Sequence, residues 1–170
     1  TINSYNNYSL TINYDTLSRI VKEIQTISGS TYQQQYTYDS KGRIENIIYP
    51  SGLSIKQVYN ANNYLYQLKN NQTNQVVWQA NAINAEGQIQ TQAFGNGTIT
   101  SKIFDNQTNY IKQINVQKSS LVLQNQLFDF DAIGNLKFRK DALINKQENF
   151  TYDMLNRLTM SEIVNGDSLI

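Results

Sequence analysis

The sequence predicts an all-β protein made of antiparallel β-hairpin repeats. A short motif recurs seven times in 170 residues: an aromatic or large apolar residue, Asp or Asn, two or three variable positions, Gly or Asn, one further residue and an aliphatic. The Asp or Asn residues of successive copies lie about 21 to 26 residues apart, a period that indicates a repeat architecture. The intervening segments are rich in strand-forming residues, and no segment has the apolar periodicity of a helix.

The first two residues of each copy are expected to end a strand. Aromatic residues two positions apart, such as Tyr36 and Tyr38 or Phe128 and Phe130, project from the same face of a strand. The seven copies begin at Tyr14-Asp15, Tyr38-Asp39, Tyr59-Asn60, Ile83-Asn84, Phe104-Asp105, Phe130-Asp131 and Tyr152-Asp153. The Asp or Asn then begins a turn, because its side chain accepts backbone N–H groups shortly after it.

The Gly or Asn of each copy is expected to supply the positive φ that a short hairpin loop closing on a bulge requires. Ser18 occupies this position in the first copy, which therefore has the weakest turn signal. The turn after Asp105 is one residue longer, so Asn109 takes the position there. The other copies place Gly42, Asn63, Gly87, Gly134 and Asn156 at this position.

The aliphatic residue of each copy is expected to begin the next strand, as in the segment 44–49. A single hairpin is marginally stable in water, whereas stacked hairpins bury a shared face. We therefore expect residues 1–170 to form one array in which each repeat contacts only its neighbours. Further turns are expected at Pro50-Ser51-Gly52, Gly95-Asn96-Gly97 and Ser119-Ser120.

The composition excludes several classes of function. A net charge of +1 gives no field that would attract nucleic acid, and no apolar run is long enough to span a membrane. The hydrophobic fraction of 39% is low for a closed globule, and tyrosine, with 12 residues, is the most frequent large side chain. Tyrosine buries its ring while its hydroxyl remains hydrated, which suits a sheet with one wet face.

The sequence offers little catalytic chemistry, and we expect no catalytic, cofactor-binding or metal-binding residues. His and Cys are absent, which removes the commonest general base and the thiolate ligands. The motif carboxylates are expected to cap turns; a Ca²⁺ ladder would require several converging oxygens at each ion. A glycosidase would require two acids held across a cleft, and no such pair is identifiable. Arg19, Arg43 and Arg157 follow the turn in three copies. Three alternative roles are open to them: contacting a ligand, pairing with the turn Asp, or stacking on an aromatic residue of the next repeat.

The best copies of the motif resemble a known repeat family. Tyr38-Asp39 with Gly42-Arg43-Ile44, Phe130-Asp131 with Gly134-Asn135-Leu136, and the segment 152–158 resemble the YD repeats of the Rhs family. That family includes bacterial Rhs polymorphic toxins, the B and C subunits of insecticidal Tc toxin complexes, cell-wall-associated repeat proteins and teneurins. The segment 78–97 resembles a longer variant of the repeat, so the resemblance covers essentially the whole chain.

The resemblance implies a fold and a function. YD repeats form hairpins that spiral into a hollow, β-solenoid-like shell, which in toxin members encloses a toxic C-terminal domain and in teneurins is a scaffold for adhesion. Toxin shells are closed by a core region that acts as an aspartyl autoprotease. The only proline here is Pro50, so no Asp-Pro core motif follows Leu158. The chain also begins at Thr1 without Met, and we expect a strip or arc that is a fragment of a longer shell.

These observations predict a non-catalytic segment of a bacterial YD-repeat shell that encapsulates or scaffolds a C-terminal toxin or effector domain, in a protein that is secreted or at the cell surface. Its expected partners are the rest of the shell or an encapsulated polypeptide, with no cofactor and no nucleic acid. The alternative is a cell-surface adhesion module that binds glycans or a protein. The residues expected to build the repeat are Tyr14, Asp15, Tyr38, Asp39, Gly42, Arg43, Tyr59, Asn60, Gly87, Phe104, Asp105, Phe130, Asp131, Gly134, Tyr152, Asp153 and Arg157.

Overall fold

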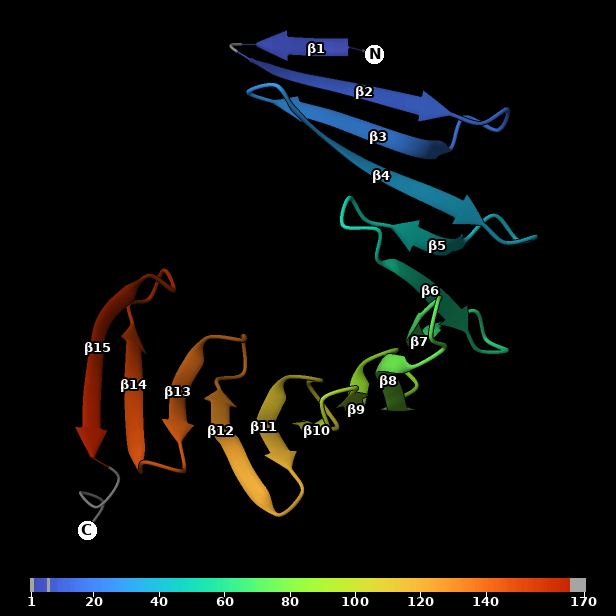
Figure 1. Cartoon of the computed structure of the whole chain (residues 1–170). Coiled ribbons are helices and arrows are strands. Elements are labelled where there is room, and N and C mark those ends of the chain that lie inside the picture. The colour runs from blue at the N-terminus through green and yellow to red at the C-terminus, as the bar shows by residue number, and fades with distance from the viewer. Residues whose placement is uncertain (1, 6, 166–170) are drawn as a thin grey trace. The chain divides into compact units, whose positions relative to one another are not determined.

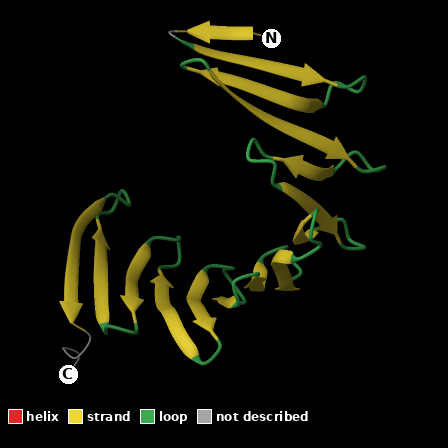
Figure 2. Cartoon of the chain, in the orientation of Figure 1, coloured by secondary structure: helices red, strands yellow, loops and turns green. Residues whose placement is uncertain are grey.

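The computed structural model describes residues 2–5 and 7–165, and this part of the chain consists of β-strands joined by turns, without helices (Figure 2). The predicted all-β class is therefore confirmed. The chain divides into two compact units, Thr1–Gln79 and Ala80–Ile170.

Unit 1 is a series of antiparallel strands in which every strand pairs with its neighbours in sequence (Figure 1). Its strands are β1 (Ile2–Tyr5), β2 (Tyr8–Tyr14), β3 (Ile20–Ile27), β4 (Ser30–Tyr38), β5 (Ile44–Ile48), β6 (Ser54–Tyr59), β7 (Leu65–Asn70) and the first half of β8 (Val76–Ile83). Such sequential pairing gives each hairpin contacts with the preceding and following hairpins only.

Unit 2 follows the same plan. After the end of β8, its strands are β9 (Ile89–Phe94), β10 (Thr98–Phe104), β11 (Ile111–Lys118), β12 (Leu121–Phe130), β13 (Leu136–Asp141), β14 (Lys146–Tyr152) and β15 (Leu158–Asn165). From β9 to β15, each strand pairs antiparallel with the next one along the chain. The predicted hairpin repeats are therefore present in both units.

The seven copies of the motif form the turns that lead from an even-numbered to an odd-numbered strand, and these are called the motif turns below. The remaining turns lead from odd to even strands, so within a unit the two kinds lie at opposite ends of the strands (Figure 2). In six motif hairpins the register shifts immediately before the aromatic residue, as between Thr37 and Tyr38. This shift is the β-bulge on which the loop closes.

Every motif turn contains one residue with positive φ. These residues are Ser18 (61°), Gly42 (79°), Asn63 (66°), Gly87 (82°), Asn109 (59°), Gly134 (94°) and Asn156 (60°). The first hairpin thus forms with a serine in the left-handed region, although serine enters it less readily than Gly or Asn. Turns also occur at the three further places expected from the sequence, with Gly52, Gly97 and Ser119 at positive φ.

The described strands bury almost no side chain completely. Ala80 is the one apolar residue among them that is buried, together with the polar residues Ser54 and Thr100. Most strand residues are half-buried by neighbours on the same face, such as Tyr36, which lies opposite Ile47. Since no second layer covers these strands within a unit, contacts between adjacent hairpins supply most of the stability.

Candidate functional site

The candidate functional site is the row of motif turns in each unit, because the repeated polar residues are concentrated there. In the second turn, Asp39 Oδ1 accepts the backbone N–H groups of Lys41 and Arg43 at 2.9 and 3.0 Å. Asp39 Oδ2 accepts Nε and Nη2 of Arg43 at 2.8 and 2.6 Å. One carboxylate therefore holds both the backbone of the loop and the arginine that follows it.

The first and last turns repeat this geometry. Asp15 accepts the backbone N–H groups of Leu17 and Arg19, and its second oxygen lies 2.7 Å from Arg19 Nη2. Asp153 binds Arg157 in the same way, with the corresponding distance also 2.7 Å. Hydrogen bonds from the backbone of Arg19 and of Arg157 lower the pKa of Asp15 and of Asp153. These carboxylates are therefore charged at neutral pH and are weak bases.

The other motif acids also accept hydrogen bonds, and their pKa values are also lowered. Burial raises the pKa of Asp39, but hydrogen bonds from the Arg43 side chain and backbone outweigh it, and the net pKa is lowered. Asp131 shows the same balance with Asn135, whose backbone and side chain both donate to it. Asp105 differs, because its second oxygen accepts Lys112 Nζ at 2.7 Å, and this bond holds its pKa far below the usual range.

Asparagine performs the same task in two turns. Asn60 Oδ1 accepts the backbone N–H groups of Asn62 and Tyr64, both at 3.0 Å. Asn84 accepts the N–H of Gln88 at 2.7 Å and donates its own amide to the Gln88 side chain at 2.8 Å. The turn thus requires an oxygen acceptor and not a charge. Among the described residues, no group of three or more acidic side chains is arranged to hold a metal ion.

The motif tyrosines connect each repeat to the preceding one. The Tyr38 hydroxyl donates to the carbonyl of Ile20 at 2.6 Å, and the Tyr152 hydroxyl donates to the carbonyl of Leu136 at 3.1 Å. The Tyr59 hydroxyl lies 2.9 Å from the carbonyl of Ile44. In each case the acceptor is the aliphatic residue that begins the strand after the previous motif turn. The tyrosine therefore packs its ring and satisfies its hydroxyl within the array.

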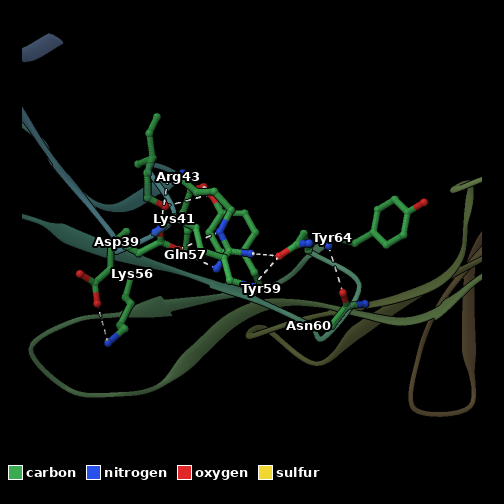
Figure 3. A network of polar contacts seen from close by, with 11 residues as sticks. Asp39, Lys41, Arg43, Lys56, Gln57, Tyr59, Asn60 and Tyr64 are labelled. Carbon is green, nitrogen blue, oxygen red and sulfur yellow. Dashed lines mark hydrogen bonds and ion pairs between the residues drawn. The ribbon is translucent and has the colours of Figure 1, made fainter. Parts of the chain in front are cut away.

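The arginines complete this connection in unit 1. The guanidinium carbon of Arg19 lies 4.2 Å from the centre of the Tyr38 ring, and that of Arg43 lies 4.1 Å from the centre of the Tyr59 ring. Figure 3 shows Arg43 between Asp39 and Tyr59. The sequence left pairing with the turn Asp and stacking on the next aromatic as alternatives. The structure shows that these two arginines do both.

In several motif turns, the residue after the positive-φ residue also reaches the next motif turn, and we call this place in the motif the linking position. Arg43 Nη1 donates to Asn63 Oδ1 at 2.9 Å. Gln88 Nε2 donates to the carbonyl of Asn109 at 3.1 Å. Asn135 Nδ2 lies 3.2 Å from Asn156 Oδ1. In each pair the partner is the positive-φ residue of the following turn, so the loops are joined directly.

Tyr110 occupies the linking position of the fifth motif turn. Its hydroxyl lies against Gly134, where an added Cβ would be only 2.8 Å from the hydroxyl oxygen. Its ring packs on Phe130 with the ring centroids 5.1 Å apart. The sequence singled out only the arginines at this position, and missed Gln88, Tyr110 and Asn135. The available signal was their shared place between the Gly or Asn and the aliphatic residue.

The acids that line one cavity, and the tryptophan Trp78, have neighbours within the hairpin array. A cavity of about 180 Å³ beside the fifth and sixth motif turns is lined by Asp105, Asp129 and Asp131 among others. Each of these acids is paired, since Asp129 binds Lys137 Nζ at 2.6 Å and the other two have the partners described above. Trp78, on β8, lies opposite Leu68 on β7. No helix in the described part of the chain is long and apolar enough to cross a membrane.

The structure therefore defines a class of protein: an array of antiparallel hairpins joined through a row of Asp/Asn turns. Neither the family models nor the curated proteins contain a match to the chain. Among solved structures, the chain is similar to TcdB2-TccC3, with a TM-score of 0.78 and 17% identity over 90% of this chain and 9% of that one. It is also similar to the Tc holotoxin pore of Photorhabdus luminescens, with a TM-score of 0.76 and 18% identity over 91% of this chain.

The comparisons confirm the resemblance seen in the sequence at the level of fold. A third similar structure, TcdB2-TccC3-TEV, has a TM-score of 0.76 and 17% identity. These are Tc toxin proteins, one of the groups to which the YD motifs pointed. The chain spans 9% of the length of the solved chains that it matches. The likeness supports the array of antiparallel hairpins as the fold of this chain.

Proposed function

We propose that this chain is a non-catalytic segment of a YD-repeat shell that encloses or scaffolds a C-terminal toxin or effector domain. The observation that carries the proposal is the use of the motif residues. The acid, the arginine and the aromatic of a repeat bind one another or the adjacent repeat, as Asp39, Arg43 and Tyr59 do. Residues engaged in this way build a continuous surface and are not themselves available as acids or bases for catalysis.

The mechanism is physical exclusion. Successive hairpins pair edge to edge, so each unit presents a continuous sheet without gaps between its described strands. A polypeptide held behind such a surface is separated from proteases and from the components of its host. The partners in this proposal are the rest of the shell and the enclosed polypeptide. We infer that the protein is bacterial and acts outside the cell that makes it, in keeping with the Tc toxin likeness.

Limited proteolysis of the complete gene product tests the encapsulation role. The expected result is that a segment C-terminal to the repeats resists protease in the intact protein and is digested when expressed alone. Arg43→Ala, which removes one of the two hydrogen bonds that Asn63 accepts from the preceding motif turn, should increase the digestion of that segment in the intact protein. Equal digestion of the segment in the intact protein and alone would overturn the proposal.

Adhesion is the second candidate, and exposed tyrosines favour it. Tyr14, Tyr32 and Tyr64 have about half of their surface exposed, and aromatic rings of this kind stack on sugars and pack at protein interfaces. A glycan array probed with the 170-residue chain tests this function. Binding that is lost in Tyr32→Ser and Tyr64→Ser would support adhesion, whereas an array without signal would remove the glycan form of this candidate.

A further inference from the structure

The β11–β12 hairpin extends beyond its neighbour and leaves part of a strand unpaired on one side. β12 begins at Leu121, but its pairing with β13 begins only at Gln126, which lies opposite Asp141. The last backbone contact before that point is from the N–H of Ala142 to the carbonyl of Asn125, at 2.8 Å. In the described structure, Leu121, Val122 and Gln124 pair with β11 alone, while Leu123 is the extra residue of a β-bulge. We call residues 121–124 the β12 overhang.

The β12 overhang is apolar and exposed. Leu121, Val122 and Leu123 have 63%, 38% and 46% of their surface accessible. The neighbouring β13–β14 turn adds two further exposed apolar residues, Leu143 and Ile144. An edge with unpaired backbone groups and apolar side chains is a template for another strand, and folded proteins normally protect such edges with charges, prolines or bulges. Residues 121–124 contain no charge and no proline, and the bulge at Leu123 is the one such feature in the overhang.

Unit 1 contains a second overhang, whose pairing with β3 has no bulge and whose composition is different. β4 begins at Ser30, whereas its pairing with β5 begins at Gln35. The residues in between, 30–34, read Ser-Thr-Tyr-Gln-Gln, so this edge is polar. The apolar sequence of the β12 overhang is therefore not a requirement of a protruding hairpin. The β4 overhang provides a matched control within the same chain.

The charges around the β12 overhang have one predominant sign. Lys118 lies opposite Leu121 on β11, at the tip of the hairpin. Lys140 precedes the β13–β14 turn and Lys146 follows it, while the one acid there, Asp141, accepts the N–H of Leu143 at 2.9 Å. Two copies of this edge would bring like charges together, whereas a strand with acidic ends would meet opposite charges.

We propose that the β12 overhang binds an extended segment of another polypeptide, apolar in its centre and acidic at its ends, by β-strand addition. The incoming strand continues the ladder that β13 forms with β12, antiparallel to β12 and beyond the Ala142–Asn125 contact. The backbone supplies the affinity and the apolar side chains supply the specificity. This site is independent of whether the repeats enclose a toxin domain.

Fluorescence anisotropy on the 170-residue chain tests the proposal. The probe is a fluorescein-labelled peptide of about eight residues, with alternating valine and threonine between paired aspartates, a length that covers the overhang and its flanks. The wild-type chain should bind it, and Leu123→Lys should weaken binding about tenfold or more. The matched variant Gln33→Lys, on the β4 overhang, should leave the affinity unchanged. Leu123 is exposed, so its substitution should preserve the far-UV circular dichroism spectrum.

Two further probes test the mode of binding. N-methylation of alternate residues removes backbone N–H donors, so the methylated peptide should bind about tenfold more weakly or worse. A peptide with lysine ends should also bind more weakly, and increasingly so at low salt. Equal binding of the methylated peptide, or equal loss in both overhang variants, would overturn the proposal. Sedimentation that shows a dimer abolished by Leu123→Lys would also overturn it, because the occupant would then be a second copy.

Discussion

The link between successive motif turns makes the most specific prediction, and Arg43 is the residue with which to test it. Arg43→Ala removes the pairing with Asp39, the stacking on Tyr59 and the hydrogen bond to Asn63. Arg157 makes the same pairing with Asp153, but its side chain is 72% exposed, compared with 27% for Arg43. Both substitutions remove the pairing within the turn, so its contribution cancels when their effects on the free energy of unfolding are subtracted. The remaining difference measures the link from Arg43 to the next repeat.

The magnitude follows from the two contacts that make up this link. A guanidinium over an aromatic ring contributes about 0.5–1 kcal/mol at a partly exposed site, and a side-chain hydrogen bond contributes about 0.5–1.5 kcal/mol. Arg43→Ala should therefore lower the free energy of unfolding by about 1–2.5 kcal/mol more than Arg157→Ala does. Asn63→Gly keeps a residue that accepts positive φ and removes the oxygen that accepts both Arg43 Nη1 and Lys41 Nζ. The part that belongs to Arg43 is the coupling energy of the two substitutions.

Urea denaturation and native-state hydrogen exchange of the 170-residue chain provide the measurements. Exchange should accelerate in β4 to β7 for Arg43→Ala and in β14 and β15 for Arg157→Ala, because the repeats open locally. A double-mutant cycle of Arg43→Ala with Asn63→Gly, and another with Tyr59→Leu, measure each coupling directly. Coupling energies below about 0.3 kcal/mol in both cycles would refute the inference that Arg43 joins the two turns.

Three further predictions concern a glycine, a tyrosine and the motif acids. Gly134→Ala should lower the free energy of unfolding by about 1–3 kcal/mol more than the control Gly52→Ala in urea denaturation, because both have positive φ but only the first new Cβ would meet a tyrosine hydroxyl; equal costs would contradict the contact. Tyr38→Phe should cost about 0.5–1.5 kcal/mol, because it removes the hydrogen bond to the Ile20 carbonyl; unchanged stability would show that this bond contributes nothing. The motif acids have lowered pKa values when folded, so they release protons on folding; the urea midpoint should be constant above about pH 5 and should fall as the pH drops through 4 and below. Asp105→Asn should reduce this acid sensitivity, and a midpoint that rises on acidification would contradict the sign.

The local part of the fold could be predicted because its causes are local in sequence. Asp39 and Gly42 lie within one loop, and their turn requires only an acceptor oxygen and a residue at positive φ. The same chemistry applies to Asn60 with Asn63, where the charge is absent and the turn is unchanged. Ser18 was the weakest signal, yet it takes a φ of 61°, because the pairing of the flanking strands outweighs the preference of one residue.

The roles of the arginines could be predicted only in part. The sequence placed Arg19 and Arg43 close enough to the turn Asp for pairing, since the separation is four residues. Stacking on Tyr38 or Tyr59 requires the strand register, which brings together residues that are 19 or 16 positions apart, respectively. Sequence patterns do not specify such a distance without knowing where each strand begins to pair, so the two roles remained alternatives.

The hairpins, their turns and the likeness to YD-repeat shells could be predicted from the sequence alone, because each depends on a motif of about seven residues that acts on its own backbone. How the repeats are joined is visible only in the structure. It placed Gln88 and Asn135 against the next turn, and it ended the pairing of β12 with β13 at Gln126. These features depend on the relative lengths and registers of adjacent strands, which long-range pairing sets and local turn chemistry does not.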